Sequence, residues 1–200
     1  MNSIRLYGVA VLLIALTGCA SGPVFVKPEP AKLVLGKSNK ADVLQSQLAK
    51  PISQQDITVN GEKAISINYA TGESPQFWGL LIERRFGTYT LFNDVLVGQE
   101  FNSTYKGEST EFDTDKISSI VKGKTTRSEV IALLGTPSGF VIYPVIADPK
   151  GSGLVYGYTW ARFAGILTMS KTNLLVVSLD ENNVVTNVSF KYNGVEQIKG

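Results

Sequence analysis

Apolar and polar residues recur in the same order twice along this chain. Residues 36–43, Gly-Lys-Ser-Asn-Lys-Ala-Asp-Val, align with residues 123–130, Gly-Lys-Thr-Thr-Arg-Ser-Glu-Val, which lie 87 positions later. In each copy an apolar turn precedes the glycine, and apolar residues with helical spacing follow it until a proline, Pro51 or Pro137. The pattern therefore predicts two short helices in each copy, joined at a glycine that suits a left-handed backbone conformation.

The second predicted helix of each copy begins with residues typical of an N-terminal cap. Thr126 and Glu129 fit a capping box, and Asn39 with the shorter acid Asp42 is its counterpart in the first copy. Because each motif residue has a local backbone reason to be present, we expect these residues to make the fold rather than bind a partner. They are Gly36, Asn39, Asp42, Gly123, Thr126, Glu129, Gly135 and Pro137.

Beyond each predicted helix pair the apolar spacing changes from helical to alternating. Between residues 184 and 192, Val, Thr, Val, Phe and Tyr fall on one face, as in a half-buried strand. Loops of turn-forming residues, Asn93-Asp94 and Asp180–Asn183, separate such segments and indicate hairpins. The strands predicted in this way cover residues 65–70, 88–92 and 95–105 in the first copy and 154–160, 173–179 and 184–192 in the second.

These elements predict an α+β fold of two tandem repeats, residues 33–107 and 108–200. We expect each repeat to be a helix-turn-helix pair packed on its own three- to four-stranded antiparallel sheet, because helices that precede a sheet in sequence commonly pack on one of its faces.

The first eighteen residues have the pattern of an export signal. Arg5 precedes an apolar run from Leu6 to Leu16, which is shorter than the roughly 20 residues that a spanning helix needs. With Leu16-Thr17-Gly18-Cys19, this segment resembles a bacterial lipoprotein signal peptide, and the resemblance implies a mature chain that begins at an acylated Cys19. An ordinary signal peptide or an uncleaved anchor is the alternative.

Residues 19–32 are rich in proline and predict a short tether between the lipid anchor and the folded part. Ala20 and Ser21 follow the cysteine where an inner-membrane lipoprotein typically has an aspartate. By this resemblance we expect the protein to be anchored in the outer membrane and to face the periplasm.

Composition narrows the classes of function. The chain is 44% hydrophobic and 18% charged, which is typical of a globular protein, and the mature part is nearly neutral, which argues against binding to nucleic acid. Cys19 is the only cysteine and histidine is absent, so we expect no internal disulfide, no metal site and no cofactor.

The sequence offers little for catalysis, and we expect the protein not to be an enzyme. Gly36-Lys37-Ser38 ends like a P-loop, but no glycine stands five residues earlier and no strand leads into it. Ser170 and Lys171 are the residue types of a Ser-Lys hydrolase, yet neighbouring residues of a strand point to opposite faces.

Two protein families resemble parts of this plan. Residues 120–137, with their Gly-Lys-Thr-Thr and Leu-Leu-Gly-Thr-Pro motifs, resemble the signature of the SmpA/OmlA (BamE-like) lipoprotein family over about twenty residues. The resemblance implies two helices on a three-stranded sheet and a link to outer-membrane β-barrel assembly; the first copy departs from it at residues 48–51. The tandem plan is also similar to that of the β-lactamase inhibitory proteins, although those carry disulfides.

An apolar segment in the first copy is the candidate contact surface. Residues 77–82, Phe-Trp-Gly-Leu-Leu-Ile, can be a buried strand, a seam between the copies, or an exposed patch that docks to a partner or lipid surface. Two arginines follow it and suit an acidic partner or a lipid headgroup. The candidate contact residues are Phe77, Trp78, Leu80, Leu81, Arg84 and Arg85.

The leading functional hypothesis is a non-catalytic scaffold or accessory subunit of an envelope complex, with the β-barrel assembly machinery suggested by resemblance alone. An inhibitor or ligand-sensing clamp, formed by the two tandem sheets, is the alternative. Direct contact with lipid or peptidoglycan is a third possibility. The partners expected are envelope proteins, together with outer-membrane lipid through Cys19.

Overall fold

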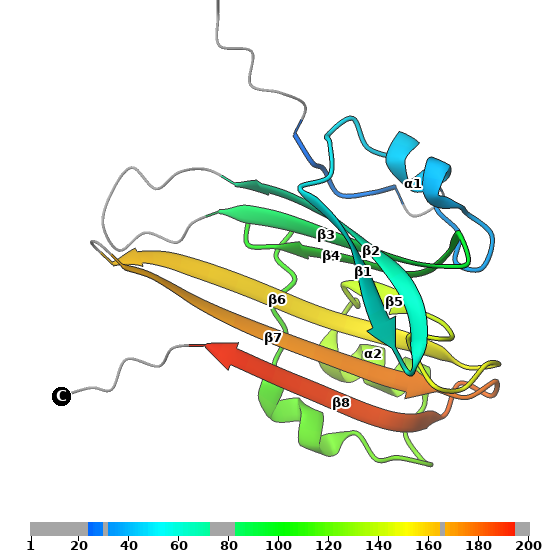
Figure 1. Cartoon of the computed structure of the whole chain (residues 1–200). Helices are drawn as coiled ribbons and strands as arrows, with labels where there is room; N and C mark the ends of the chain where they lie inside the picture. The colour runs from blue at the N-terminus through cyan, green and yellow to red at the C-terminus, as the bar shows by residue number, and fades with distance from the viewer. Residues whose placement is uncertain (1–23, 30–31, 73–82, 165–166, 195–200) are drawn as a thin grey trace, which may run out of the picture.

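The computed structural model describes residues 24–29, 32–72, 83–164 and 167–194, with side chains omitted for residues 162–164 and 167–169. This part of the chain has eight strands and three short helical segments, with α1 before the first four strands and η1 and α2 before the last four (Figure 1). The strands are β1 (Ser53–Val59), β2 (Glu62–Gly72), β3 (Arg84–Phe92), β4 (Val95–Ser103), β5 (Gly139–Val141), β6 (Ser152–Ala164), β7 (Leu167–Leu179) and β8 (Val185–Gly194). The helical segments are α1 (Lys40–Gln45), the 3₁₀ turn η1 (Thr114–Ser119) and α2 (Arg127–Leu134).

All eight strands belong to one antiparallel sheet in the order of the sequence, and the sheet is curled. The predicted fold class, an α+β fold of two helix-pair repeats each on its own sheet, is therefore wrong. β5 pairs with β4 on one side and with β6 on the other, so the strands of the two copies join into one sheet.

The joining strand was missed because it is short and follows a turn. β5 has three residues, and the sequence around Pro137 reads as the end of a helix. Its first residue, Gly139, lies against the β4 backbone so closely that a Cβ there would overlap the carbonyl oxygen of Gln99. The junction thus depends on a glycine that lets the two backbones approach closely, and not on an alternating pattern of apolar residues.

The predicted helix pairs are also wrong, since each copy has one α-helix. Residues before Gly36 form turns, and those before Gly123 form η1. Only one side chain of each apolar turn, Leu33 or Ile120, is buried. A first helical turn is costly to nucleate, and so short a segment with one buried residue does not offset that cost.

The segments that lead into α1 and α2 have the same hydrogen bonds in both copies. The amides of Gly36 and Gly123 donate to the carbonyl oxygens of Leu96 and Val185, both at 2.8 Å. A complete capping box starts each helix, with Asn39 and Asp42 in the first copy and Thr126 and Glu129 in the second. The repeated motif therefore docks a helix start onto the first residues of β4 and of β8.

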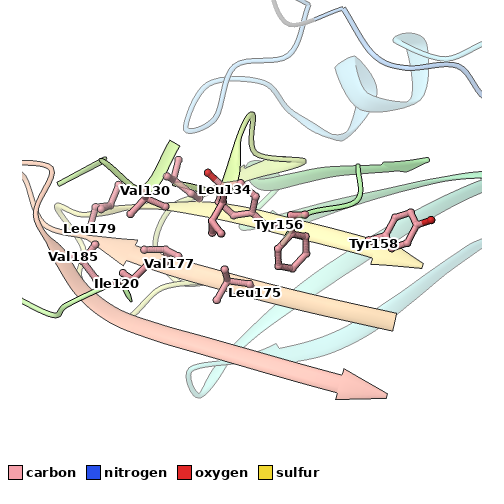
Figure 2. Packing of buried hydrophobic residues seen from close by; sticks show 11 residues of the cluster. Ile120, Val130, Leu134, Tyr156, Tyr158, Leu175, Val177, Leu179 and Val185 are labelled. Atoms are coloured by element: carbon pink, nitrogen blue, oxygen red, sulfur yellow. The ribbon is translucent and has the colours of Figure 1, made fainter. Parts of the chain in front are cut away.

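The two larger hydrophobic cores, one under each α-helix, lie on the same face of the sheet, and a smaller cluster of Val141, Ile146 and Val155 lies on the opposite face. Paired residues of adjacent antiparallel strands point to the same side, and the ladder runs from Tyr89 through Gln99 and Phe140 to Leu154. Tyr89 belongs to the core under α1 and Leu154 to the core under α2, which Figure 2 shows from close by. We call this the helix face, and the opposite one the open face.

Phe25, within the predicted tether, is part of the first core. Its ring stacks on Tyr69 at 5.3 Å between centroids and lies over Gly87, where a Cβ would overlap the ring. Phe112, 87 residues later, packs on the equivalent tyrosine, Tyr156, at 5.7 Å between centroids, with the rings tilted by 55°. The repeat therefore includes an aromatic residue that comes before the first aligned glycine.

No helix of the described residues is long and apolar enough to span a membrane. The predicted signal peptide, residues 1–18, and the predicted lipidation site Cys19 lie outside the described residues. Their assignment stays a prediction.

Candidate binding face

The open face of the sheet is concave. The turn between β1 and β2 reaches across it, because the Asn60 side-chain amide donates to the carbonyl oxygens of Pro144 and Val145 at 2.8 and 3.2 Å. Ile146, in the same loop, packs on Val141 and Val155 of the open face. The loop of residues 142–150 thus closes one end of the concavity and leaves the rest of the open face without a covering helix in the described part of the chain (Figure 1).

Glycines line the open face where the sheet bends between the copies. By register, Gly98, Gly139, Gly153 and Gly157 all point to this side of β4, β5 and β6. A Cβ at Gly153 would meet Val141 at 2.5 Å, and one at Gly157 would overlap the carboxyl oxygen of Glu100. On the inside of a curve side chains crowd together, so glycines allow the sheet to curl here.

Beyond the end of β5, hydroxyl groups bridge β4 and β6. The Gly157 amide donates to Ser138 Oγ at 2.8 Å, and Thr110 Oγ1 donates to the Gly157 carbonyl oxygen at 2.8 Å. The Ser103 amide in turn donates to Thr110 Oγ1. We call this place, where the two copies meet on the open face, the seam.

Glu100 lies at the seam, in the space that Gly157 leaves. Its carboxylate accepts a hydrogen bond from the Asn102 side-chain amide at 2.6 Å. A polar row leads to it across the first copy, since Glu100 is opposite Thr88, Thr88 donates to Asn68, and Asn68 donates to Ser53. The other acid on the described strands of this face, Glu62, accepts from Tyr143 at the closed end.

The environment of Glu100 disfavours its charged form. Burial raises the pKa of the Glu100 carboxyl above its ordinary value, and the hydrogen bond from Asn102 opposes part of this effect. An acid held where folding penalises its charge is a common sign of a functional position. Glu100 is therefore the candidate binding residue of the open face.

Replacing Glu100 with glutamine should stabilise the protein at neutral pH and have less effect in acid. Because the folded-state pKa is raised, the wild-type protein loses stability as pH rises from the unfolded-state value through the folded-state value. The glutamine variant has no such loss. Urea unfolding over a pH series should show its advantage growing from about pH 4 towards neutrality, about where the ordinary carboxyl titrates.

Glu129→Gln is a control of opposite sign. The Thr126 amide donates to the Glu129 carboxylate and lowers the pKa of this acid, so its contribution appears above the ordinary pKa and is lost as pH falls. If the gain in unfolding free energy from Glu100→Gln does not change with pH, the folded state does not penalise the charged form of Glu100, and this prediction is wrong.

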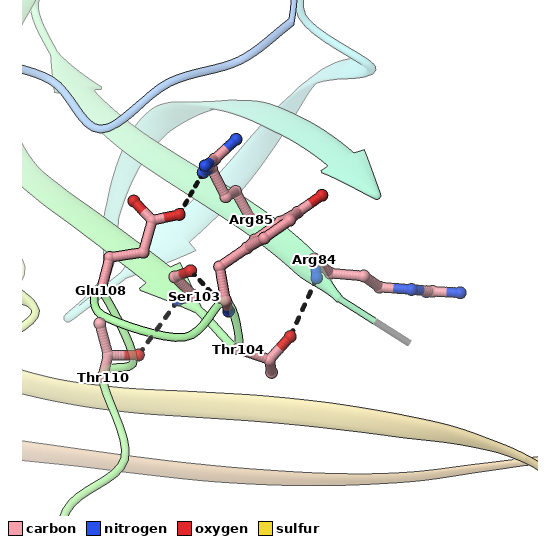
Figure 3. A network of polar contacts seen from close by, with 7 residues as sticks. Arg84, Arg85, Ser103, Thr104, Glu108 and Thr110 are labelled. Atoms are coloured by element: carbon pink, nitrogen blue, oxygen red, sulfur yellow. Dashed lines mark hydrogen bonds and ion pairs between the residues drawn. The ribbon is translucent and has the colours of Figure 1, made fainter. Parts of the chain in front are cut away.

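The predicted contact residues are placed only in part. Phe77, Trp78, Leu80 and Leu81 lie outside the described residues. Arg85 points to the Glu108 carboxylate and lies over the Tyr105 ring at 4.2 Å, whereas the Arg84 side chain extends away from this network (Figure 3). Arg85 thus has an intramolecular role, and partner or lipid contact by either arginine stays a prediction.

Three aromatic residues of the second copy, Tyr156, Tyr158 and Trp160, lie in or against the core on the helix face. Tyr143 lies at the closed end of the open face, edge-on to Phe92. Tyr156 is in the core on the helix face, where its hydroxyl donates to the Gly135 carbonyl oxygen and burial raises its pKa to about 12. Core packing thus accounts for Tyr156.

Comparison with known proteins leaves the family open. No family model matches the chain, and no curated protein matches its sequence. A solved structure that matches is that of a "putative beta-lactamase inhibitor protein" from Streptococcus mutans, with 10% sequence identity, a TM-score of 0.38, and coverage of 77% of this chain and 82% of that one. This similarity is too low to carry a fold or a function across. The resemblance to the SmpA/OmlA family rests on the motif residues alone.

Sequence reasoning missed Glu100 because nothing local distinguishes it. It stands in a strand between Gln99 and Phe101, where an acid on the polar side of an amphipathic strand is unremarkable. The signal that could have found it is the glycine in the next copy, Gly157, but only the folded sheet brings Gly157 of β6 next to Glu100 of β4 at the seam. Among the described residues, no group of three or more acidic, cysteine or histidine side chains is placed to hold a metal ion.

Proposed function

We propose that this protein is a non-catalytic binding protein of the cell envelope, anchored to the outer membrane through Cys19, that holds a protein partner in the concavity of its sheet. Glu100 receives a lysine or arginine side chain of that partner. The observation that carries the proposal is the Glu100 carboxylate at the seam, on a face that both helices leave free.

The shape of the open face favours a protein ligand. It is built from strands of both copies, and its exposed or half-exposed polar side chains include Gln55, Thr88, Ser170, Asn187 and Ser189. A broad, open surface that carries exposed polar side chains beside the apolar cluster of Val141, Ile146 and Val155 suits a protein ligand, whereas small ligands prefer enclosed, mainly apolar pockets. Burial disfavours the charged form of Glu100, and a cation from the partner would favour it, so the two charges would attract.

The scaffold hypothesis for β-barrel assembly has no separate support among the described residues. The motif residues that resemble the SmpA/OmlA family cap helices and make turns in both copies. The clamp hypothesis is therefore the one that we develop.

Site-specific photocrosslinking in cells tests the proposal. With the photoreactive residue p-benzoylphenylalanine in the full chain at Gln55 or at Ser170, one on each copy of the open face, we expect a crosslinked adduct of the same partner. Ala132, exposed on α2, is the matched position on the helix face and should give none.

Glu100 is then tested in the same system. Glu100→Gln should reduce the adduct severalfold while the protein level is unchanged. Equal adduct yields from both faces would contradict binding in the concavity. An adduct yield that Glu100→Gln does not change would contradict binding of a partner's cation by Glu100.

A further inference from the structure

The two edge strands of the sheet, β8 and β1, are the repeat equivalents of β4 and β5, the two strands that pair where the copies join. β8 is the second-copy equivalent of β4, since Leu96 and Val185 accept the same hydrogen bond from Gly36 and Gly123. β1 is the first-copy equivalent of β5. Each is the first strand after the α-helix of its copy, and each pairs with the following strand, which carries the core residue Ile67 in β2 or Leu154 in β6. Within the chain β4 pairs with β5, while β8 and β1 are the end strands of the described sheet.

The open edge at β8 exposes aromatic residues whose equivalents are buried. Phe101 in β4 is 5% exposed and its neighbour on the same face, Ser103, is 1% exposed. The corresponding residues of β8, Phe190 and Tyr192, are 40% and 46% exposed. Exposed aromatic side chains on an unpaired edge strand mark a surface that can accept another strand.

The edge at β1 exposes apolar residues of its own. Leu48 is 88% exposed and Ile52, immediately before β1, is 64% exposed. Ile52 corresponds to Ser138, the residue immediately before β5, because Ser53 and Gly139 hold the same place in the two copies. Pro137 and Ser138 line the same hollow as Phe101 at the internal junction. Ile52 at the β1 edge and Phe190 at the β8 edge are thus both exposed, at the positions that Ser138 and Phe101 hold at the internal junction.

We propose that β8 of one molecule pairs with β1 of a second copy, antiparallel and head to tail, as β4 pairs with β5 inside the chain. The internal register, with Glu100 opposite Gly139, transfers to Ser189 opposite Ser53. By the same register, Phe190 of one copy lies opposite Ile52 of the next, and Tyr192 lies opposite Lys50. A second copy is the occupant because this chain already shows that its own strand type fits this edge.

The transferred register predicts which two residues a disulfide crosslink between the copies would join. In β4 the Phe101 amide and the Val97 carbonyl point to the β5 side, so Glu100 and Gly139 form a non-hydrogen-bonded pair. Residues in such pairs have Cα atoms about 4.5 Å apart, a distance that a disulfide can bridge. Ser53 and Ser189 are both exposed, so cysteines at these positions leave the cores untouched.

The test uses the full chain in the bacterial envelope. One differently tagged copy carries Ser53→Cys and the other Ser189→Cys, and mild oxidation is applied to cells. We expect a disulfide-linked dimer that contains both tags, whereas the unaltered chain, with Cys19 alone, should give none. Absence of the mixed dimer would overturn the proposal, as would an equal yield of Ser189→Cys joined to itself.

A second variant tests the apolar contact. Phe190→Ser combined with Tyr192→Ser should lower the yield of the mixed dimer severalfold, since the buried aromatic area is lost. Val121→Ser, at an exposed apolar residue of the turn before Gly123, is the matched control and should leave the yield unchanged. A yield that does not respond to the aromatic substitutions would contradict the proposed packing. Because this experiment does not involve Glu100 or a foreign partner, its failure is distinct from failure of the proposed function.

Discussion

Replacing Phe25 with alanine should lower the free energy of unfolding by about 3–5 kcal/mol, the range for removing a fully buried phenylalanine. The ring is 1% exposed, stacks on Tyr69 and packs at 5.9 Å on Phe101. Gly87 lies beneath it without a side chain, so nothing nearby can fill the space. Urea unfolding of the purified chain measures the change.

Two substitutions control this prediction. Val24→Ala removes the exposed neighbour and should change stability by less than about 0.5 kcal/mol, as surface substitutions do. Phe112→Ala removes the equivalent ring of the second copy, which is 8% exposed, and should also be strongly destabilising. If Phe25→Ala behaves like Val24→Ala, residues 24–29 are a tether and not part of the first core.

Replacing Gly139 with alanine should separate the two copies of the sheet at the β4–β5 junction. The added Cβ would overlap the Gln99 carbonyl oxygen and lie 2.8 Å from the Glu100 Cα, so backbone and not a flexible side chain would have to move. We expect a loss of about 3 kcal/mol or more, at the upper end of overpacking effects. Amide hydrogen exchange should show the loss of protection concentrated in β4, β5 and the start of β6.

Gly98→Ala is the matched control for this junction. Gly98 belongs to the same strand pair, opposite Val141. A Cβ added there would meet side-chain atoms of Thr90 and Val141, at 3.3 Å. A smaller loss is expected because these side chains can shift by a few tenths of an ångström. Equal losses from the two variants would mean that the approach of the β5 backbone to β4 is not what limits the junction.

The elements that local chemistry determines are the ones that sequence could predict. The N-caps of α1 and α2 depend on residues three positions apart, and the hairpin loops at Asn93-Asp94 and Asp180–Asn183 depend on residues that tolerate a left-handed backbone. Asn93, Asp94 and Asn183 indeed have positive φ angles. The three strands predicted in each copy overlap β2, β3 and β4 and their counterparts β6, β7 and β8.

The elements that sequence missed depend on contacts between distant residues. β1 has no buried apolar alternation, and β5 is three residues long, so each exists only because a neighbouring strand offers hydrogen bonds. The place of Glu100 at the seam depends on Gly157, 57 residues away, which leaves room for its carboxylate. Phe25 lies in the stretch predicted as a tether, and its burial depends on Tyr69, Gly87 and Phe101, which are distant in sequence.

By itself the sequence determined the repeat, its helix caps, its turns and the alternation of its longer strands, since each depends on residues close together in the chain. Only the tertiary structure decided that the two copies share one curled sheet, that both cores lie on one face, and that the other face is left open around Glu100. The physical reason is that a β-sheet continues wherever an unpaired edge meets another backbone of matching register, and hydrogen bonding between strands leaves little trace in the side chains. The curl depends on glycines whose neighbours are brought together only by folding.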